Sequence, residues 1–147
     1  MKRFLFVVIC GFSLCGCAPK SEKENNSLQQ EVQSFLDQYN KEYQKQLTAS
    51  NEGQWKLNTY IVDGDTITSK ESAKADEELA KFTGSKEVIE KAKKYLEGKT
   101  RLTPLQTRQL DCILFLAGNN PETAGDIVKQ RIEAQGAIVG QRPLQAV

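Results

Sequence analysis

The chain has 147 residues, with 20 basic and 19 acidic side chains, and this balance gives no electrostatic footprint for nucleic acid as a partner. Histidine is absent from the whole sequence, which excludes Ser/His and Cys/His nucleophile pairs and zinc sites built on two histidines. Composition therefore removes the commonest catalytic and zinc-binding arrangements from this chain.

Residues 1–16 are predicted to be a lipoprotein signal peptide. Two basic residues precede a mostly apolar stretch of roughly eleven residues, which suits a secretory signal and is too short to span a bilayer as a helix. The stretch ends in "LCGC" at 14–17, which resembles the bacterial lipoprotein cleavage box, so we expect acylation of Cys17. The alternative is an ordinary signal peptide cut near Gly16, which would leave a soluble secreted chain.

Acylation of Cys17 would make the lipid bilayer a partner of the mature chain. Ala18 comes next, in place of the Asp that favours inner-membrane retention in some bacteria. We therefore expect a place in the bacterial envelope, on the outer membrane facing the periplasm. Residues 17–27, the acylated Cys and the polar "APKSEKENNS", are predicted to form a flexible tether before a helical domain at 28–147.

Helix start signals recur along residues 27–123. Three stretches place Ser or Thr three residues before Glu or Gln, the capping-box spacing: "SLQQ" at 27–30, "TSKE" at 68–71 and "TPLQ" at 103–106. Pro104 suits a first helical position, and "NPET" at 120–123 predicts another start, with Asn120 as its cap. Together these signals predict several helices in succession.

The first predicted helix carries an apolar stripe on one face. The steps between its apolar residues fit the helical period: Leu28, Val32, Phe35, Leu36, Tyr39, Tyr43 and Leu47. The pattern blurs beyond residue 47 but is compatible with a helix that continues through Trp55 to about Tyr60, with Gly53 as a weak point. The next stretch, "VDGDT" at 62–66, predicts a turn.

Four further helices are predicted, at 69–82, 86–97, 104–118 and about 121–135. Gly98 is a natural stop for the helix at 86–97. The helix at 104–118 is apolar nearly all round from Cys112 to Ala117, so we expect it to be the most buried element, with Cys112 as an inert buried thiol. The tail "AIVGQRPLQAV" after Gly136 shows no helical period. The fold class predicted is all-α, with antiparallel helices and a long first helix.

The best candidate for a metal site is "DGDTIT", with Asp63 and Asp65. A calcium loop would next need an oxygen ligand, a Gly and a Glu, where this chain has Ile67, Thr68 and Lys74. The two aspartates are therefore interpreted as a solvated turn, and no metal ligand or catalytic residue is assigned.

The carboxylates of Asp76, Glu77 and Glu78 are interpreted as a solvated helix face, because lysines accompany them. Trp55, the only Trp, has no catalytic group to assist in this chain, and by itself it is interpreted as a helix-packing residue.

Two long stretches resemble one enzyme family. "FLDQYNKEYQKQLTASNEGQWKLNTYIVDGDTIT" at 35–68 resembles the amino-terminal helix of the angiotensin-converting-enzyme family of zinc peptidyl-dipeptidases, with Trp55, Asn58-Thr59 and Ile67-Thr68 in matching order. "LTPLQTRQLDCILFLAGNNPETAGDIVKQRIEAQGAI" at 102–138 is similar to the helices that lead toward the catalytic core in bacterial members. The resemblance covers nearly all of residues 30–140.

That family implies a large helical ellipsoid whose first helices form a lid over a deep channel. Two His and a Glu around an HExxH helix hold its zinc cofactor, and the enzyme releases dipeptides from peptide C-termini. The chain ends at Val147, before that motif would be expected, so no catalytic residue carries over and no cofactor is expected in this chain. The resemblance implies a partial peptidase-like domain, a truncated lid segment that is inactive alone.

As a lid, the chain would place Trp55, Asn58 and Thr59 toward the cleft and leave its tyrosine stripe exposed. A separate chain with the catalytic core would be its partner. The alternative is a small helical envelope lipoprotein that acts as a binding or scaffolding module. A complete enzyme that works without histidine is the least favoured interpretation.

Overall fold

A computed structural model describes residues 20–60 and 66–140 of this chain, and these residues form an all-α fold, as predicted. The α-helices are α1 (Lys20–Thr59), α2 (Ile67–Thr83), α3 (Lys86–Glu97), α4 (Pro104–Gly118) and α5 (Gly125–Gly140). Two short 3-10 turns join them, η1 (Lys99–Arg101) before α4 and η2 (Glu122–Ala124) before α5. None of the described helices combines the length and apolar character that crossing a bilayer requires.

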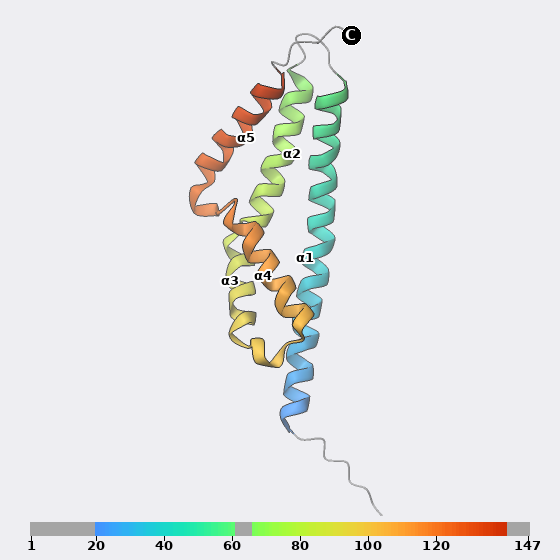
Figure 1. Cartoon of the computed structure of the whole chain (residues 1–147), viewed down its shortest axis with the longest axis vertical. Coiled ribbons are helices and arrows are strands. Elements are labelled where there is room, and N and C mark those ends of the chain that lie inside the picture. Colours follow the sequence, from blue (N-terminus) through green and yellow to red (C-terminus); the bar gives the residue numbers. More distant parts are fainter. Residues whose placement is uncertain (1–19, 61–65, 141–147) are drawn as a thin grey trace, which may run out of the picture.

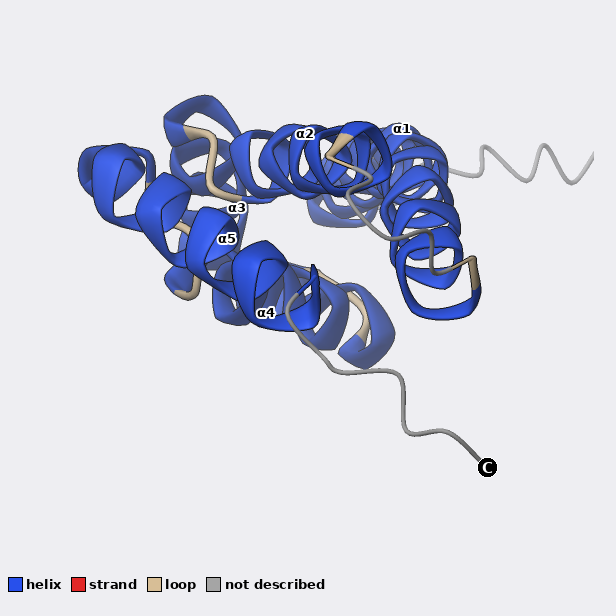
Figure 2. Ribbon diagram, turned by 90° about the horizontal axis from the view of Figure 1, so that it is seen from above, coloured by secondary structure: helices blue, strands red, loops and turns tan. Residues whose placement is uncertain are grey.

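The helices are arranged along one long axis. Figure 1 shows α1 and α2 side by side, with α3 continuing below α2, α4 crossing in front and α5 rising beside α2. Seen from above in Figure 2, α1 and α2 form one layer, and α4 and α5 form a second layer against it. The first turns of α1 extend beyond the other helices at the lower end.

The main core lies between α1, α3 and α4. It contains the first half of the predicted stripe together with residues of the later helices: Val32, Phe35, Leu36, Tyr39, Ala92, Tyr95, Leu102, Leu110 and Ile113. Phe35 packs on Tyr95 with ring centroids 5.4 Å apart, and Tyr39 stacks on Phe82 at 5.1 Å. The aromatic residues of α1 therefore gain their partners from α2 and α3 of the same chain.

The tyrosine stripe is not exposed, contrary to what the resemblance to a lid implied. Tyr39 is 5% exposed and Tyr43, whose ring stacks on it at 5.9 Å, is half-buried. Phe82 and Tyr95 cover this part of α1, because α2 and α3 fold back along it.

The upper contact between α1 and α2 is made by small and polar residues. Gly53 lies so close to the Cα of Ser72 that an added Cβ would be only 3.0 Å from it. Ser50 donates a hydrogen bond to Asp76 Oδ1, and Gln54 Nε2 donates one to Asp76 Oδ2 at 2.6 Å. Asp76 is thus a half-buried link between two helices, which corrects its interpretation as part of a solvated face.

The two predictions with the strongest local signals are confirmed. The helix at 86–97 has the predicted bounds, with Gly98 at its end. At the start of α4, Thr103 Oγ1 accepts from the Gln106 backbone N–H at 3.2 Å and Gln106 Oε1 accepts from the Thr103 N–H at 3.2 Å, with Pro104 in the first turn.

Other predicted boundaries were wrong. α1 begins at Lys20, so residues 20–27 are helical rather than a flexible tether and Ser27 caps nothing. Thr66 precedes α2 without a side-chain capping bond, and the predicted cap Thr68 lies inside the helix.

The fifth helix lies further along the chain than predicted. A 3-10 turn occupies 122–124, and α5 runs from Gly125 to Gly140, so the first part of the tail is helical. Asn120 does not cap it; its side chain hydrogen bonds to Thr83 and Arg131 instead. The aspartates at 63 and 65, and residues 1–19 and 141–147, lie outside the described residues.

The helix predicted to be the most buried has one exposed face. α4 buries Gln106, Leu110, Ile113 and Ala117, whereas Phe115 is 77% exposed. Cys112 is also exposed, which corrects its interpretation as a buried thiol. The reason is geometric, because the same side of α4, with Leu110 and Ile113, packs against residues of both α1 and α3.

Candidate functional site

The residues predicted to face a cleft lie in the last turns of α1. Asn58 Nδ2 donates to the Gln54 carbonyl at 2.7 Å, and Thr59 Oγ1 donates to the Trp55 carbonyl at 2.7 Å. Both bonds stay within α1, so these two side chains are satisfied by their own helix. The indole of Trp55 is 71% exposed, and its interpretation as a helix-packing residue is therefore wrong.

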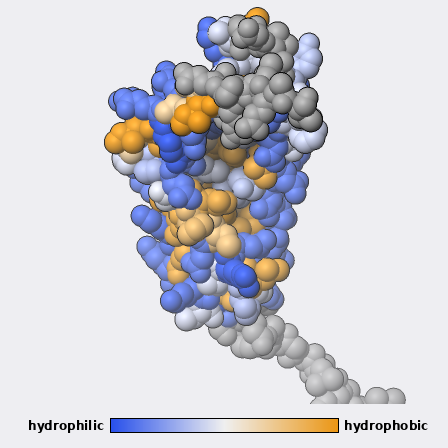
Figure 3. Space-filling view, turned by 45° about the horizontal axis from the view of Figure 1, so that its top comes forward, coloured by the Kyte–Doolittle hydropathy of each residue, from blue (hydrophilic) through white to orange (hydrophobic). Residues whose placement is uncertain are grey.

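Large apolar side chains remain exposed on three parts of the described chain. They lie where α1 ends and α2 begins, on α4 and on α5: Trp55, Tyr60, Ile67, Leu105, Phe115, Ile127 and Ile138. Figure 3 shows apolar side chains gathered in the middle of one face, with hydrophilic residues around them. Exposed apolar surface of this kind marks contact sites when its members adjoin.

On α4 the exposed apolar residues share one side of the helix, with the exposed Arg108 between them. Leu105, Cys112 and Phe115 are exposed and, at 100° per residue, fall within about a quarter of the helix circumference. We call these three residues the α4 outer face. It points away from the buried side that carries Leu110 and Ile113.

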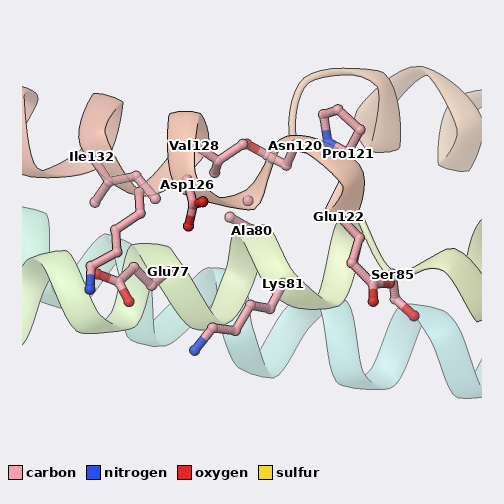
Figure 4. Close-up of a pocket in the computed structure, with 12 residues that line it drawn as sticks. Glu77, Ala80, Lys81, Ser85, Asn120, Pro121, Glu122, Asp126, Val128 and Ile132 are labelled. Carbon is pink, nitrogen blue, oxygen red and sulfur yellow. The ribbon is translucent and has the colours of Figure 1, made fainter.

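A cavity of about 500 Å³ lies between α2 and α5. Figure 4 shows Ala80 of α2 below, with Val128 and Ile132 of α5 above and Pro121 at one end. Charged residues of both signs also line it: Glu77, Lys81, Glu122, Asp126 and Lys129. The cavity thus has an apolar lining of four residues and mixed charges around it.

Hydrogen bonds fix one end of this cavity. The Glu122 N–H donates to the Gly84 carbonyl at 3.1 Å, and the Glu122 carboxylate accepts from the Lys86 N–H at 2.7 Å. Arg131 of α5 donates to the Asn120 side chain at 2.6 Å. These contacts hold the α4–α5 connection on the α2–α3 corner, so the cavity is part of a fixed arrangement.

Three of its five ionisable residues make structural contacts. Lys81 pairs with Glu78 at 3.2 Å and Lys129 pairs with Glu133 at 4.0 Å, each within its own helix. The Glu122 carboxylate is taken by the first backbone N–H of α3. The described residues hold no group of three or more metal-ligating side chains. What this cavity can do is bind an apolar or mixed-charge group.

Two buried tyrosines have shifted ionisation. Burial, and secondarily the neighbouring Tyr43, raises the pKa of Tyr39 to about 12. Burial, together with a hydrogen bond to the Glu31 carboxylate at 2.9 Å, raises the pKa of Tyr95 to about 12. Both phenols therefore stay neutral well above the pH at which an exposed tyrosine ionises, and they act as packing groups.

The cavity was not predicted from the sequence, because its residues are spread over α2, the α4–α5 connection and α5. The available signal was the spacing of Val128 and Ile132, four residues apart on one helix face, which indicated an apolar side for α5 without identifying its neighbour.

Comparison with known proteins assigns no relative. No protein-family model, curated protein or solved structure matches this chain.

Proposed function

We propose that this chain is the N-terminal lid segment of a zinc peptidyl-dipeptidase resembling the angiotensin-converting-enzyme family. In this proposal acylated Cys17 holds the chain on the periplasmic side of the outer membrane. The zinc ligands and the water-activating Glu come from outside these 147 residues, since the sequence contains no histidine. The chain by itself releases no dipeptides.

The observation that carries the proposal is the α4 outer face. Large apolar side chains on the exposed side of a packed helix are expected where a second body covers that side. Phe115 is 77% exposed and Leu105 is 66% exposed on a helix whose other side is fully packed. The order of residues in 35–68 and 102–138 supplies the identity of that second body, through the resemblance to the peptidase family.

The first test is genetic and enzymatic. DNA shortly downstream of this reading frame should encode HExxH, either in frame or out of frame. A core expressed from that region should bind the mature chain and, with zinc, release dipeptides from peptide C-termini. The mature chain with zinc alone should give no more product than a reaction without protein, and product above that level would overturn the claim of inactivity.

A pair of variants tests the surface. Phe115→Ser should weaken binding to the core, because it removes an exposed aromatic anchor from the α4 outer face. Ile127→Ser is the matched control, since Ile127 is 68% exposed on α5 and loses apolar area in the same way. Equal effects of the two substitutions would remove the α4 outer face from the proposal.

A second candidate function is a helical envelope lipoprotein that acts as a binding or scaffolding module. It is favoured by the closed core, in which α2 and α3 of the same chain cover Tyr39, and by the cavity between α2 and α5. This candidate expects no HExxH downstream and a chain that unfolds cooperatively as a monomer. The lid proposal expects the motif and association through α4.

A further inference from the structure

Positive charge is concentrated at one end of the molecule. Residues 91–101 contain five basic side chains and one acidic side chain: Lys91, Lys93, Lys94, Lys99, Arg101 and Glu97. In the rest of the described chain, acidic residues outnumber basic ones. The near-neutral total therefore conceals a charge asymmetry that composition does not reveal.

This basic segment lies at the end from which the anchor would emerge. It forms the second half of α3, η1 and the approach to α4, which Figure 1 shows at the lower end, beside α1 and just above its projecting first turns. Gln29 Nε2 donates to the Arg101 carbonyl at 2.7 Å, and Gln106 Nε2 donates to the Gln29 carbonyl at 2.8 Å. These two bonds fix η1 and the start of α4 on α1, so the basic segment has a defined position relative to the N-terminus of the helix.

The basic side chains of this segment are exposed and make no ion pair within the described residues. The four ion pairs among the described residues each join two residues of one helix, on α1, α2, α3 and α5. Four basic residues of the segment take part in none of them: Lys93, Lys94, Lys99 and Arg101. Lys91, by contrast, lies over the Phe35 ring at 5.2 Å from its centroid. The four unpaired residues, here named the basic tip, are free to meet an anionic partner.

We propose that the basic tip binds the anionic headgroups of the bilayer that holds acylated Cys17. The inference rests on the proposed acylation, which would place this end of the chain near the membrane. Residues 20–27 project about 12 Å beyond η1 as helix. The residues from 17 to 19 add at most about 10 Å even when extended. The tip is thus tied close to the membrane surface, and tilting of α1 brings it within the screening length of about 8 Å.

Proximity selects this partner over other polyanions. A tether of this length keeps the bilayer at a high effective concentration around the tip, whereas a free polyanion must be captured from solution. Each Lys or Arg near an anionic leaflet strengthens binding by about five-fold. Four such residues acting together would fix which end of the domain faces the membrane, with α5 and the end of α1 directed away from it.

The test uses a full mature chain carrying Cys17→Ser, so that binding does not depend on the acyl group. Co-sedimentation should occur with vesicles that contain phosphatidylglycerol and be absent with vesicles of phosphatidylcholine alone, and high salt should abolish it. Lys99→Gln with Arg101→Gln should weaken binding about 25-fold, at about five-fold per residue.

The matched control is Lys70→Gln with Lys74→Gln, which removes the same charge from exposed positions on α2. It should change binding less than two-fold. Equal loss in the two double variants, equal binding to both kinds of vesicle, or no binding at low salt would each overturn the proposal. Circular dichroism of every variant guards against misfolding as the cause.

Binding to vesicles is measured independently of the proposed acylation and of the proposed lid function. Acylation is read from the mass of the N-terminal peptide of the membrane-extracted protein, and an absent acyl group would leave the vesicle result unchanged. Association with a peptidase core is read through Phe115, which is not part of the basic tip.

Discussion

Removing the hydroxyl of Tyr39 should stabilise this protein. The side chain is 5% exposed, and its Oη is buried without a hydrogen-bond partner among the described residues. Its ring is well placed, stacked on Phe82 at 5.1 Å and on Tyr43 at 5.9 Å. The polar atom is thus the only part of the side chain that loses interactions on folding, and Tyr39→Phe removes that atom while keeping the ring.

The size of the effect follows from two opposing contributions. A buried hydroxyl without a partner costs about 1–3 kcal/mol of folding free energy, and losing the dispersion contacts of one oxygen costs less than about 1 kcal/mol. Tyr39→Phe should therefore raise the free energy of unfolding by about 1 kcal/mol. Tyr95→Phe is the matched control, because the Tyr95 hydroxyl donates a hydrogen bond to Glu31 at 2.9 Å. Losing that hydrogen bond should lower the free energy of unfolding by about 1 kcal/mol.

Urea unfolding followed by far-UV circular dichroism measures both changes, provided that the m-value stays constant. The reasoning is refuted if Tyr39→Phe lowers the midpoint, since that would mean that the hydroxyl makes a favourable interaction in the folded chain. A stabilising effect of both substitutions would show that hydroxyl removal acts through the unfolded state instead.

The same pair has a pH signature. The pKa of each tyrosine rises from 10.0 to about 12 in the folded chain, chiefly through burial, so the unfolded state ionises first as pH rises. The raised pKa of each buried tyrosine makes folding stability depend on pH. Its contribution to the free energy of unfolding is fully present below pH 10 and falls by at most about 2–3 kcal/mol between pH 10 and 12. Tyr39→Phe should remove the contribution of Tyr39 and flatten the decline of stability over that pH range.

Three further changes test other parts of the structure. Gly84→Ala should lower the free energy of unfolding by about 3 kcal/mol or more, because the added Cβ would overlap the Asn120 carbonyl oxygen. Gly118→Ala should raise that free energy by about 0.5–1 kcal/mol, because its added Cβ meets nothing within 4 Å. Chemical denaturation measures both changes, and equal losses of stability would contradict the contact between Gly84 and Asn120. Cys112 is exposed, so in the chain carrying Cys17→Ser a thiol reagent should label it as fast under native conditions as in urea, and a slow native reaction would place it in the core. Trp55 is 71% exposed, so acrylamide should quench the single Trp efficiently in the folded protein, and Trp55→Ala should change the free energy of unfolding by less than about 0.5 kcal/mol.

The sequence predicted the elements whose signals are local. The bounds of α3 and α4 follow from Gly98 and from the reciprocal Thr103–Gln106 capping bonds, which involve neighbours only. Asn120 has the same local signal for a cap, but Thr83 and Arg131, distant in the sequence, take its side chain. A cap can be predicted from four residues only when no distant partner competes for it.

Burial was harder to predict than secondary structure, because hydropathy does not tell which side of a helix will be covered. Tyr39 and Phe115 are both aromatic residues on helices, yet the first is 5% exposed and the second 77%. The difference depends on α2 returning along α1, which brings Phe82 onto Tyr39, while no described helix covers the outer side of α4. The cavity between α2 and α5 escaped prediction for the same reason.

The coverage of α1 changes how a lid would use this chain. If the chain covers a larger body, that contact cannot pass through the tyrosine stripe, because Phe82 and Tyr95 already occupy it. The α4 outer face is one of the apolar surfaces left exposed, and Lys99 and Arg101 of the basic tip come just before that helix begins. The α4 outer face would then contact a protein, and the basic tip would contact the membrane. Substitution at Phe115 should therefore change association with a core and leave vesicle binding intact, and charge removal at Arg101 should do the reverse.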